Sequence, residues 1–115
     1  MDIEDAYVDY EEGNIDNEAQ HVCSESDVND LKARVNDRVT DIEKMKLMKS
    51  VLDSRNVNST QVREMMSWLA FESSRLDFAK WAYSRAVDKQ DYWKLEDAFT
   101  FSSSKDEFNE YIKAN

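Results

Sequence analysis

The chain has 115 residues, a single glycine, no proline, and 25 acidic side chains against 15 basic ones. This length suits one domain. P-loops, dinucleotide-binding turns and nucleophile elbows need glycines where the backbone approaches phosphate or turns sharply, so the composition excludes those enzyme classes. It also argues against β-sandwiches and barrels, whose tight turns rely on glycine and proline.

The acidic charge is concentrated at the N-terminus. Residues 1–30 contain 11 Asp and Glu and no Lys or Arg, which leaves 14 acidic and 15 basic residues in 31–115. Residues 1–25 mix a few apolar side chains with carboxylates, without helical or strand periodicity. Like charges repel, and little apolar surface is present to offset the entropy of ordering. We therefore expect an acidic disordered tail over 1–25 and a helical domain over 26–115.

From Ser26 onward, apolar residues recur at spacings of three and four, which is typical of one face of a helix. They are Val28, Leu31, Val35, Val39, Ile42, Met45, Met48 and Leu52. No glycine or proline interrupts the stretch, so one helix over 27–54 is a possible interpretation. Thr40 and Glu43 have the spacing of a capping box, which favours two helices, about 27–38 and 42–54.

The second half of the chain repeats itself at a shift of 30 residues. The matched pairs agree in chemistry more than in identity, and they include Asn58 with Asp88, Val62 with Tyr92, Met65 with Leu95, Leu69 with Phe99, Phe71 with Phe101 and Phe78 with Phe108. Each copy has two predicted capping boxes, at Asn58 with Gln61 and Ser74 with Asp77, or at Asp88 with Asp91 and Ser104 with Glu107. Residues 44–57 match the second half of an earlier copy. The pattern predicts about three helical hairpins of roughly 30 residues, and hence an all-α bundle of five or six short helices.

A helix predicted over 75–87 has apolar side chains on two stripes, so we place it at the centre of the bundle. Most aromatic residues of the second half are expected in the core, because a small bundle needs large side chains to bury enough area. Trp93 lies off the stripe set by Tyr92, Leu95 and Phe99. An exposed Trp93 would mark a contact surface, and burial with the other aromatics is the alternative.

The chain also resembles a known family of small helical domains, the domain-of-unknown-function 4476 family. The resemblance covers residues 37–112 and rests on Gln61-Val62, Phe71, Arg75-Leu76, Phe78-Ala79-Lys80, Ala82-Tyr83, Asp88, Asp91-Tyr92, Phe99, Phe101, Ser103, Glu107 and Tyr111-Ile112. Leu69 stands where members usually carry an aromatic residue, and the acidic tail lies outside the match. The resemblance implies a helical fold and export, with a signal segment absent from this sequence; a cytoplasmic setting is the alternative. It implies no activity and no catalytic residue.

No set of residues has the spacing of a catalytic, cofactor or metal site. His21 and Cys23 are the one pair of soft metal ligands, whereas a zinc site needs three or four protein ligands. A calcium loop aligned on Gly13 would place Val8 and Ala19 where oxygen ligands are required. We therefore expect no bound cofactor.

The expected partner is a protein. The longest apolar run, Trp68-Leu69-Ala70-Phe71, is far shorter than the roughly 18 to 20 residues of a membrane span. The excess of acid argues against nucleic acid, which needs a clustered basic face. Tyr7 and Tyr10 lie among carboxylates and are candidate recognition residues, with simple solubility of the tail as the alternative.

We therefore expect a noncatalytic interaction or scaffold module, with Tyr7, Tyr10 and Trp93 as candidate interaction residues and the acidic tail modulating the contact. The alternative is a small-ligand binder or an enzyme that uses a pocket between helices. Its residues would be Asp77, Lys80, Tyr83 and Asp88.

Overall fold

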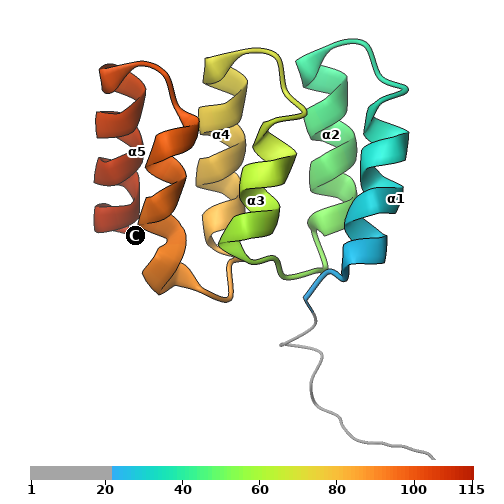
Figure 1. The fold of residues 1–115 in the computed structure, drawn as a ribbon, viewed down its shortest axis with the longest axis horizontal. Helices are drawn as coiled ribbons and strands as arrows, with labels where there is room; N and C mark the ends of the chain where they lie inside the picture. Colours follow the sequence, from blue (N-terminus) through green and yellow to red (C-terminus); the bar gives the residue numbers. More distant parts are fainter. Residues whose placement is uncertain (1–21) are drawn as a thin grey trace, which may run out of the picture.

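The computed structural model describes residues 22–115, which form six helices. These are α1 (Glu25–Val35), α2 (Asp41–Leu52), α3 (Ser59–Met66), α4 (Glu72–Tyr83), the 3-10 helix η2 (Lys89–Ala98) and α5 (Ser102–Ala114). They form three hairpins in chain order: α1 with α2 is the first hairpin, α3 with α4 the second, and η2 with α5 the third (Figure 1). The predicted all-α fold of helical hairpins is confirmed, and the stretch 27–54 is two helices.

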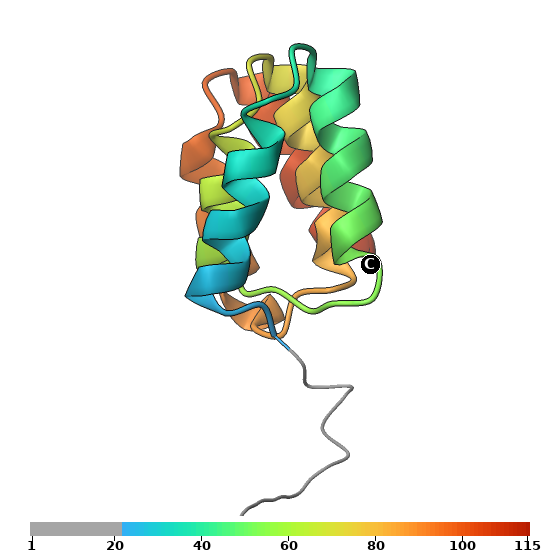
Figure 2. The same ribbon diagram turned by 90° about the vertical axis from the view of Figure 1, so that its right-hand side faces the viewer.

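The hairpins stand side by side and make two layers, with α1, α3 and η2 in one layer and α2, α4 and α5 in the other (Figures 1 and 2). The loops within the hairpins lie along one edge of the array, which we call the loop edge (Figure 1). The segments that connect successive hairpins lie along the opposite edge, the connector edge. Each hairpin therefore packs on the one before it.

The core lies between the two layers. Its largest fully buried side chains include Tyr92, Phe78, Phe108, Met48 and Leu52. Helix α4 is buried along two stripes and contacts α2, α3 and α5, so its predicted central place is confirmed. The helix itself spans Glu72–Tyr83 and begins and ends earlier than the predicted 75–87.

Two helices begin at the caps predicted from sequence. The Asn58 side chain accepts a hydrogen bond from the Gln61 amide at 2.8 Å, and the Gln61 side chain accepts one from the Asn58 amide at 3.0 Å. The Thr40 hydroxyl accepts a hydrogen bond from the Glu43 amide at 3.2 Å and caps α2. The break between the first two helices therefore lies where the sequence predicts it.

The capping boxes predicted at Ser74 and Ser104 are wrong. Helix α4 begins at Glu72 and α5 at Ser102, so both serines lie inside the first helical turn. An aromatic residue occupies each N-cap position, and its side chain makes no capping hydrogen bond. The polar groups that satisfy these helix starts come from the neighbouring hairpin.

Four apolar side chains at the loop edge that were predicted for the buried faces are exposed. They are Val39 (88% exposed), Ile42 (80%), Phe71 (67%) and Phe101 (59%). Val39 lies in the loop before α2, and Ile42 is the second residue of that helix. Phe71 and Phe101 are the N-cap residues of α4 and α5. All four lie at the loop edge, beyond the reach of the opposite layer.

The segments at the connector edge pair through their backbones. The Cys23 amide donates to the Asn56 carbonyl at 2.9 Å, and the Val57 amide donates to the Arg85 carbonyl at 3.0 Å. The Val87 amide returns a hydrogen bond to the Val57 carbonyl at 2.9 Å. These parallel bridges satisfy backbone groups of buried segments and join the three hairpins in register.

The folded region begins before the predicted boundary at residue 26. Val22 forms a backbone bridge with Asn56, and the Ser24 hydroxyl caps α1 by accepting from the Asp27 amide at 3.0 Å. Residues 22–25 therefore belong to the helical domain. The rest of the predicted tail, residues 1–21 with Tyr7, Tyr10 and His21, lies outside the described residues.

Candidate functional site

A buried carboxylate joins the first hairpin to the second at the loop edge. Asp41, the first residue of α2, accepts hydrogen bonds from the amides of Ala70 and Phe71, each at 2.9 Å. Burial disfavours the charged form of this carboxyl. The two amides, the Ser74 hydroxyl and the Lys44 ammonium outweigh that effect and lower the pKa of Asp41. Ser74, predicted to cap its own helix, instead helps to lower the pKa of a carboxylate of the preceding hairpin.

The same arrangement joins the second hairpin to the third. Glu72, the first residue of α4, accepts hydrogen bonds from the amides of Phe101 and Thr100, each at 2.9 Å. The Phe101 amide contributes most to lowering the pKa of Glu72; burial opposes it, while Thr100, Ser104 and Arg75 lower the pKa further. We call Asp41 and Glu72 the inter-hairpin carboxylates. Neither role was predicted from the sequence, although the separation of the two residues is close to the repeat length.

Asp88 acts between hairpins as well. Its carboxylate accepts hydrogen bonds from the Ser59 amide at 2.8 Å and from the Ser59 hydroxyl at 2.7 Å. It makes no capping hydrogen bond on its own helix, so the capping box predicted for Asp88 with Asp91 is wrong. Asp88, at the start of the third hairpin, thus binds the first residue of α3 in the second hairpin.

Two other residues of the predicted pocket set make separate structural contacts. Lys80 on α4 forms an ion pair with Glu107 on α5. The ring of Tyr83 packs edge to face on the buried ring of Tyr92, with the centroids 4.9 Å apart. Lys80, Tyr83 and Asp88, three of the four residues predicted for a catalytic pocket, therefore each contact a residue of a neighbouring hairpin.

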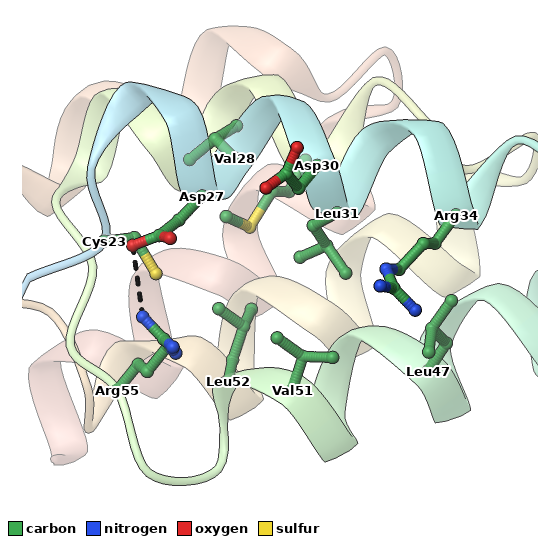
Figure 3. A pocket seen from close by; sticks show the side chains of 11 residues that line it. Cys23, Asp27, Val28, Asp30, Leu31, Arg34, Leu47, Val51, Leu52 and Arg55 are labelled. Carbon is green, nitrogen blue, oxygen red and sulfur yellow. Dashed lines mark hydrogen bonds and ion pairs between the residues drawn. The ribbon is translucent and has the colours of Figure 1, made fainter.

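A cavity of about 280 Å³ opens on the outer face of the first hairpin, between α1 and α2 (Figure 3). Val28 and Leu31 on α1 and Leu47 and Leu52 on α2 line it, with Met65 of α3 beneath them. Further hollows continue it along α1 and α2 toward the loop edge. We call this surface the first-hairpin groove.

Charged groups surround the apolar floor of the groove. The Arg55 guanidinium lies 3.1 Å from the Asp27 carboxylate and forms an ion pair with it (Figure 3). Beside this pair, burial raises the pKa of the Cys23 thiol, and Arg55 offsets only part of that effect. Asp30 and Arg34 are exposed on α1, one helical turn apart, and both line the groove. A protonated Cys23 is a weak nucleophile at neutral pH.

A second surface is apolar and follows the loop edge. Val39 and Ile42 of the first hairpin, Phe71 of the second and Phe101 of the third expose their side chains there. Figure 1 shows the three loops at the same edge of the array. We call these four residues the loop-edge row. Because these side chains are apolar, they were predicted to lie in the core, and the structure instead exposes them.

Trp93 lies on η2 and is 57% exposed. The Lys94 ammonium lies 5.8 Å from the centre of its ring, within cation–π range. Trp93 is thus accessible for a contact, as its place off the apolar stripe suggests. The other two candidate interaction residues, Tyr7 and Tyr10, lie outside the described residues.

The described part of the chain, residues 22–115, contains no group of three or more His, Cys, Asp or Glu side chains arranged to hold a metal ion. Within the same residues, no helix is long and apolar enough to cross a membrane. Cys23 is the one described member of the His21 and Cys23 pair, and its side chain is buried.

Comparison with known proteins identifies a family by sequence. The model of a family described as a domain of unknown function, DUF4476, matches residues 22–112. The match covers all six helices nearly from end to end. No curated protein and no solved structure matches the chain.

Proposed function

The chain belongs to the DUF4476 family, and because that membership names no activity, we propose from its surfaces that it is a noncatalytic protein-interaction or scaffold module. In this proposal the three hairpins form a rigid support, and the loop-edge row binds the partner protein. The acidic N-terminal segment modulates the contact.

The observation that carries the proposal is the loop-edge row. All three hairpins contribute large exposed apolar side chains to one edge. Packed helices lie about 8 to 10 Å apart, so the row extends over about 20 Å. Scattered exposed apolar residues need no explanation, but residues gathered along one edge with polar surroundings are typical of a protein contact, and aromatic residues dominate binding energy at such contacts.

The use of the carboxylates supports a noncatalytic role. A general acid or base works best with a pKa near the operating pH. Asp41 and Glu72 have lowered pKa values instead, because backbone amides and hydroxyls stabilise their charged forms. Both carboxylates bind backbone amides of the next hairpin, which is a structural role.

The charge distribution supports a modulating role for the N-terminal segment. Residues 1–30 carry 11 acidic side chains and no Lys or Arg. Such a segment attracts a basic partner and speeds encounter, and the attraction weakens as salt screens it. Tyr7, Tyr10 and Trp93 are the residues that we propose add specific contacts.

The proposal is tested by capturing partners from the source organism on the immobilised full chain and on a Phe71→Ser/Phe101→Ser variant. Ser73→Ala/Ser103→Ala is the matched control, because it alters the same helix starts without changing the apolar row. We expect the captured partner to be lost with the phenylalanine variant and retained with the control. Amide-shift mapping with that partner should place the contact at the loop edge. Equal capture by both variants, or a contact mapped away from this edge, would contradict the proposal.

A second candidate function is the binding of a small apolar ligand in the first-hairpin groove. The observation that favours it is the cavity of about 280 Å³ with an apolar floor. Ligand-observed NMR with a set of aromatic fragments tests it, with Leu47→Trp as the variant that fills the cavity. Fragments that bind the full chain and not the filled variant would support this candidate; equal binding to both, or none, would reject it.

A further inference from the structure

The two ends of the array have different outer surfaces. In α5, the last helix, the exposed side chains are polar or small, as expected for a terminal repeat that faces water. The first hairpin instead exposes the apolar groove between α1 and α2 (Figure 3). The second and third hairpins have the corresponding face covered by the hairpin before them. The first hairpin thus retains the surface of an internal repeat.

Two side chains of opposite charge lie beside the groove on α1. Asp30 and Arg34 are exposed, line the groove and lie four residues apart on one side of the helix. Neither forms an ion pair with another residue of the described structure. Between them, Ala33 is exposed and small, and it lines the adjoining hollow. A second helix can therefore approach α1 closely at this point.

This pattern complements itself. When two α1 helices pack antiparallel about a two-fold axis that passes between them, level with the midpoint of Asp30 and Arg34, Asp30 of each copy faces Arg34 of the other. Every contact in such an isologous interface occurs twice, so a single residue pair provides two ion pairs. A parallel arrangement in register would place like charges opposite each other.

We infer that the first-hairpin groove is an interface with a second copy of this chain, in which antiparallel α1 helices exchange Asp30–Arg34 ion pairs across a two-fold axis. Leu47 and Val51 of α2 line the same groove and supply apolar contact area. The interface is separate from the loop-edge row, so it leaves that row open for the partner of the proposed function.

The test is the oligomeric state of the full chain by sedimentation velocity over a range of concentrations. We expect a dimer for the natural chain. Asp30→Arg and Arg34→Asp should each raise the dissociation constant of the dimer about tenfold or more, because they place like charges opposite each other. The double variant Asp30→Arg/Arg34→Asp should restore the dimer. Asp106→Arg on α5 is the control that changes the same charge on another face, and circular dichroism confirms that each variant is folded.

Mixing the two single variants gives the sharpest result. The Asp30→Arg chain presents only positive charge at these positions and the Arg34→Asp chain only negative charge, so a mixture should form heterodimers more tightly than either variant forms homodimers. A natural chain that stays monomeric would overturn the inference. So would a dimer insensitive to these charges, a dimer lost only in the Phe71→Ser/Phe101→Ser variant, or a dimer lost only when residues 1–21 are removed.

Discussion

The junction between the first two hairpins and the outer face of the first hairpin use equivalent loop residues in different ways. At the junction, the amides of Ala70 and Phe71 donate to Asp41 of the preceding hairpin. The equivalent amides at the outer face belong to Val39 and Thr40, and they have no acceptor within residues 22–115. The difference shows that the starts of α4 and α5, which lack a side-chain cap, are completed by a carboxylate of the preceding hairpin, whereas α2 at the outer face begins with the local Thr40 cap.

The C-terminal end shows the complementary difference. Asp41 and Glu72 are the first residues of α2 and α4, and each supplies a carboxylate to the next hairpin. The first residue of α5 is Ser102, which has no carboxylate. An inter-hairpin carboxylate is therefore present at the two helix starts that lie next to the loop of a following hairpin. We infer that these carboxylates serve the packing of one hairpin on the next and not the helix that carries them.

The largest expected effect separates buried from exposed phenylalanines. Phe78 is fully buried in the core, whereas Phe71 is exposed at the loop edge. Phe78→Ala should lower the free energy of unfolding by about 3 to 5 kcal/mol, because it removes buried area and leaves a cavity. Phe71→Ala should change it by less than about 0.5 kcal/mol. Urea denaturation of both variants measures the difference, and equal losses would contradict the placement of Phe71.

A smaller effect tests the crowding around α4. Ala79 is fully buried where α4 lies between its neighbours. Ala79→Leu should cost about 1 to 3 kcal/mol through overpacking. Ala33→Leu on the exposed face of α1 is the matched control and should leave the unfolding midpoint of the isolated monomer nearly unchanged. A midpoint unaltered by Ala79→Leu would disprove the central position of this helix.

The hydrogen bonds of Asp41 at the first junction can be weakened by a single substitution. Asp41→Asn should lower the free energy of unfolding by about 1 to 3 kcal/mol at pH 7, because charge-assisted hydrogen bonds to two amides are weakened. Asp37→Asn, in the loop between α1 and α2, is the control and should have little effect. Thermal unfolding of both variants measures the contrast.

The pH dependence of Asp41 has a definite sign. Its pKa is lower in the folded chain than the value of about 3.9 in an unfolded chain. Its contribution to stability is therefore complete above pH 4 and is lost as the pH falls through the lower folded-state pKa. The stability gap between the natural chain and Asp41→Asn should narrow below about pH 4. A gap that widened on acidification would contradict the assignment.

The smallest expected effect concerns the N-terminal boundary. Removing residues 1–21 should leave the melting temperature nearly unchanged, and removing 1–25 should lower it. The second deletion also removes the Ser24 cap of α1, worth about 0.5 to 2 kcal/mol, and the backbone bridge from Cys23 to Asn56. Equal melting temperatures for the two truncated chains would show that residues 22–25 add nothing to the fold.

Local signals in the sequence predicted much of the fold. The reciprocal cap of Asn58 and Gln61 involves residues three apart, and it forms as expected. The hairpin repeat is visible because equivalent positions need side chains of similar size. The caps predicted at Ser74 and Ser104 were wrong because the carboxylates whose pKa values these serines lower, Asp41 and Glu72, lie about one repeat earlier in the chain.

The candidate surfaces were harder to predict. Val39 and Ile42 continue the apolar spacing of three and four, but the chain turns at the loop edge before they can reach the core. The first-hairpin groove depends on which hairpin has no neighbour on one side within residues 22–115, a property of the assembled array and not of any single helix. The exposure of Trp93 was predictable because this residue lies off the apolar stripe of its own helix.

Native-state hydrogen exchange at single-residue resolution tests the central claim most directly, because it compares equivalent loop amides at the junctions and at the outer face. The amides of Ala70 and Phe71, held by Asp41, and of Thr100 and Phe101, held by Glu72, should exchange about tenfold or more slowly than those of Val39 and Thr40 after correction for intrinsic rates. Similar exchange at all six amides would contradict the account that carboxylates of one hairpin complete the helix starts of the next.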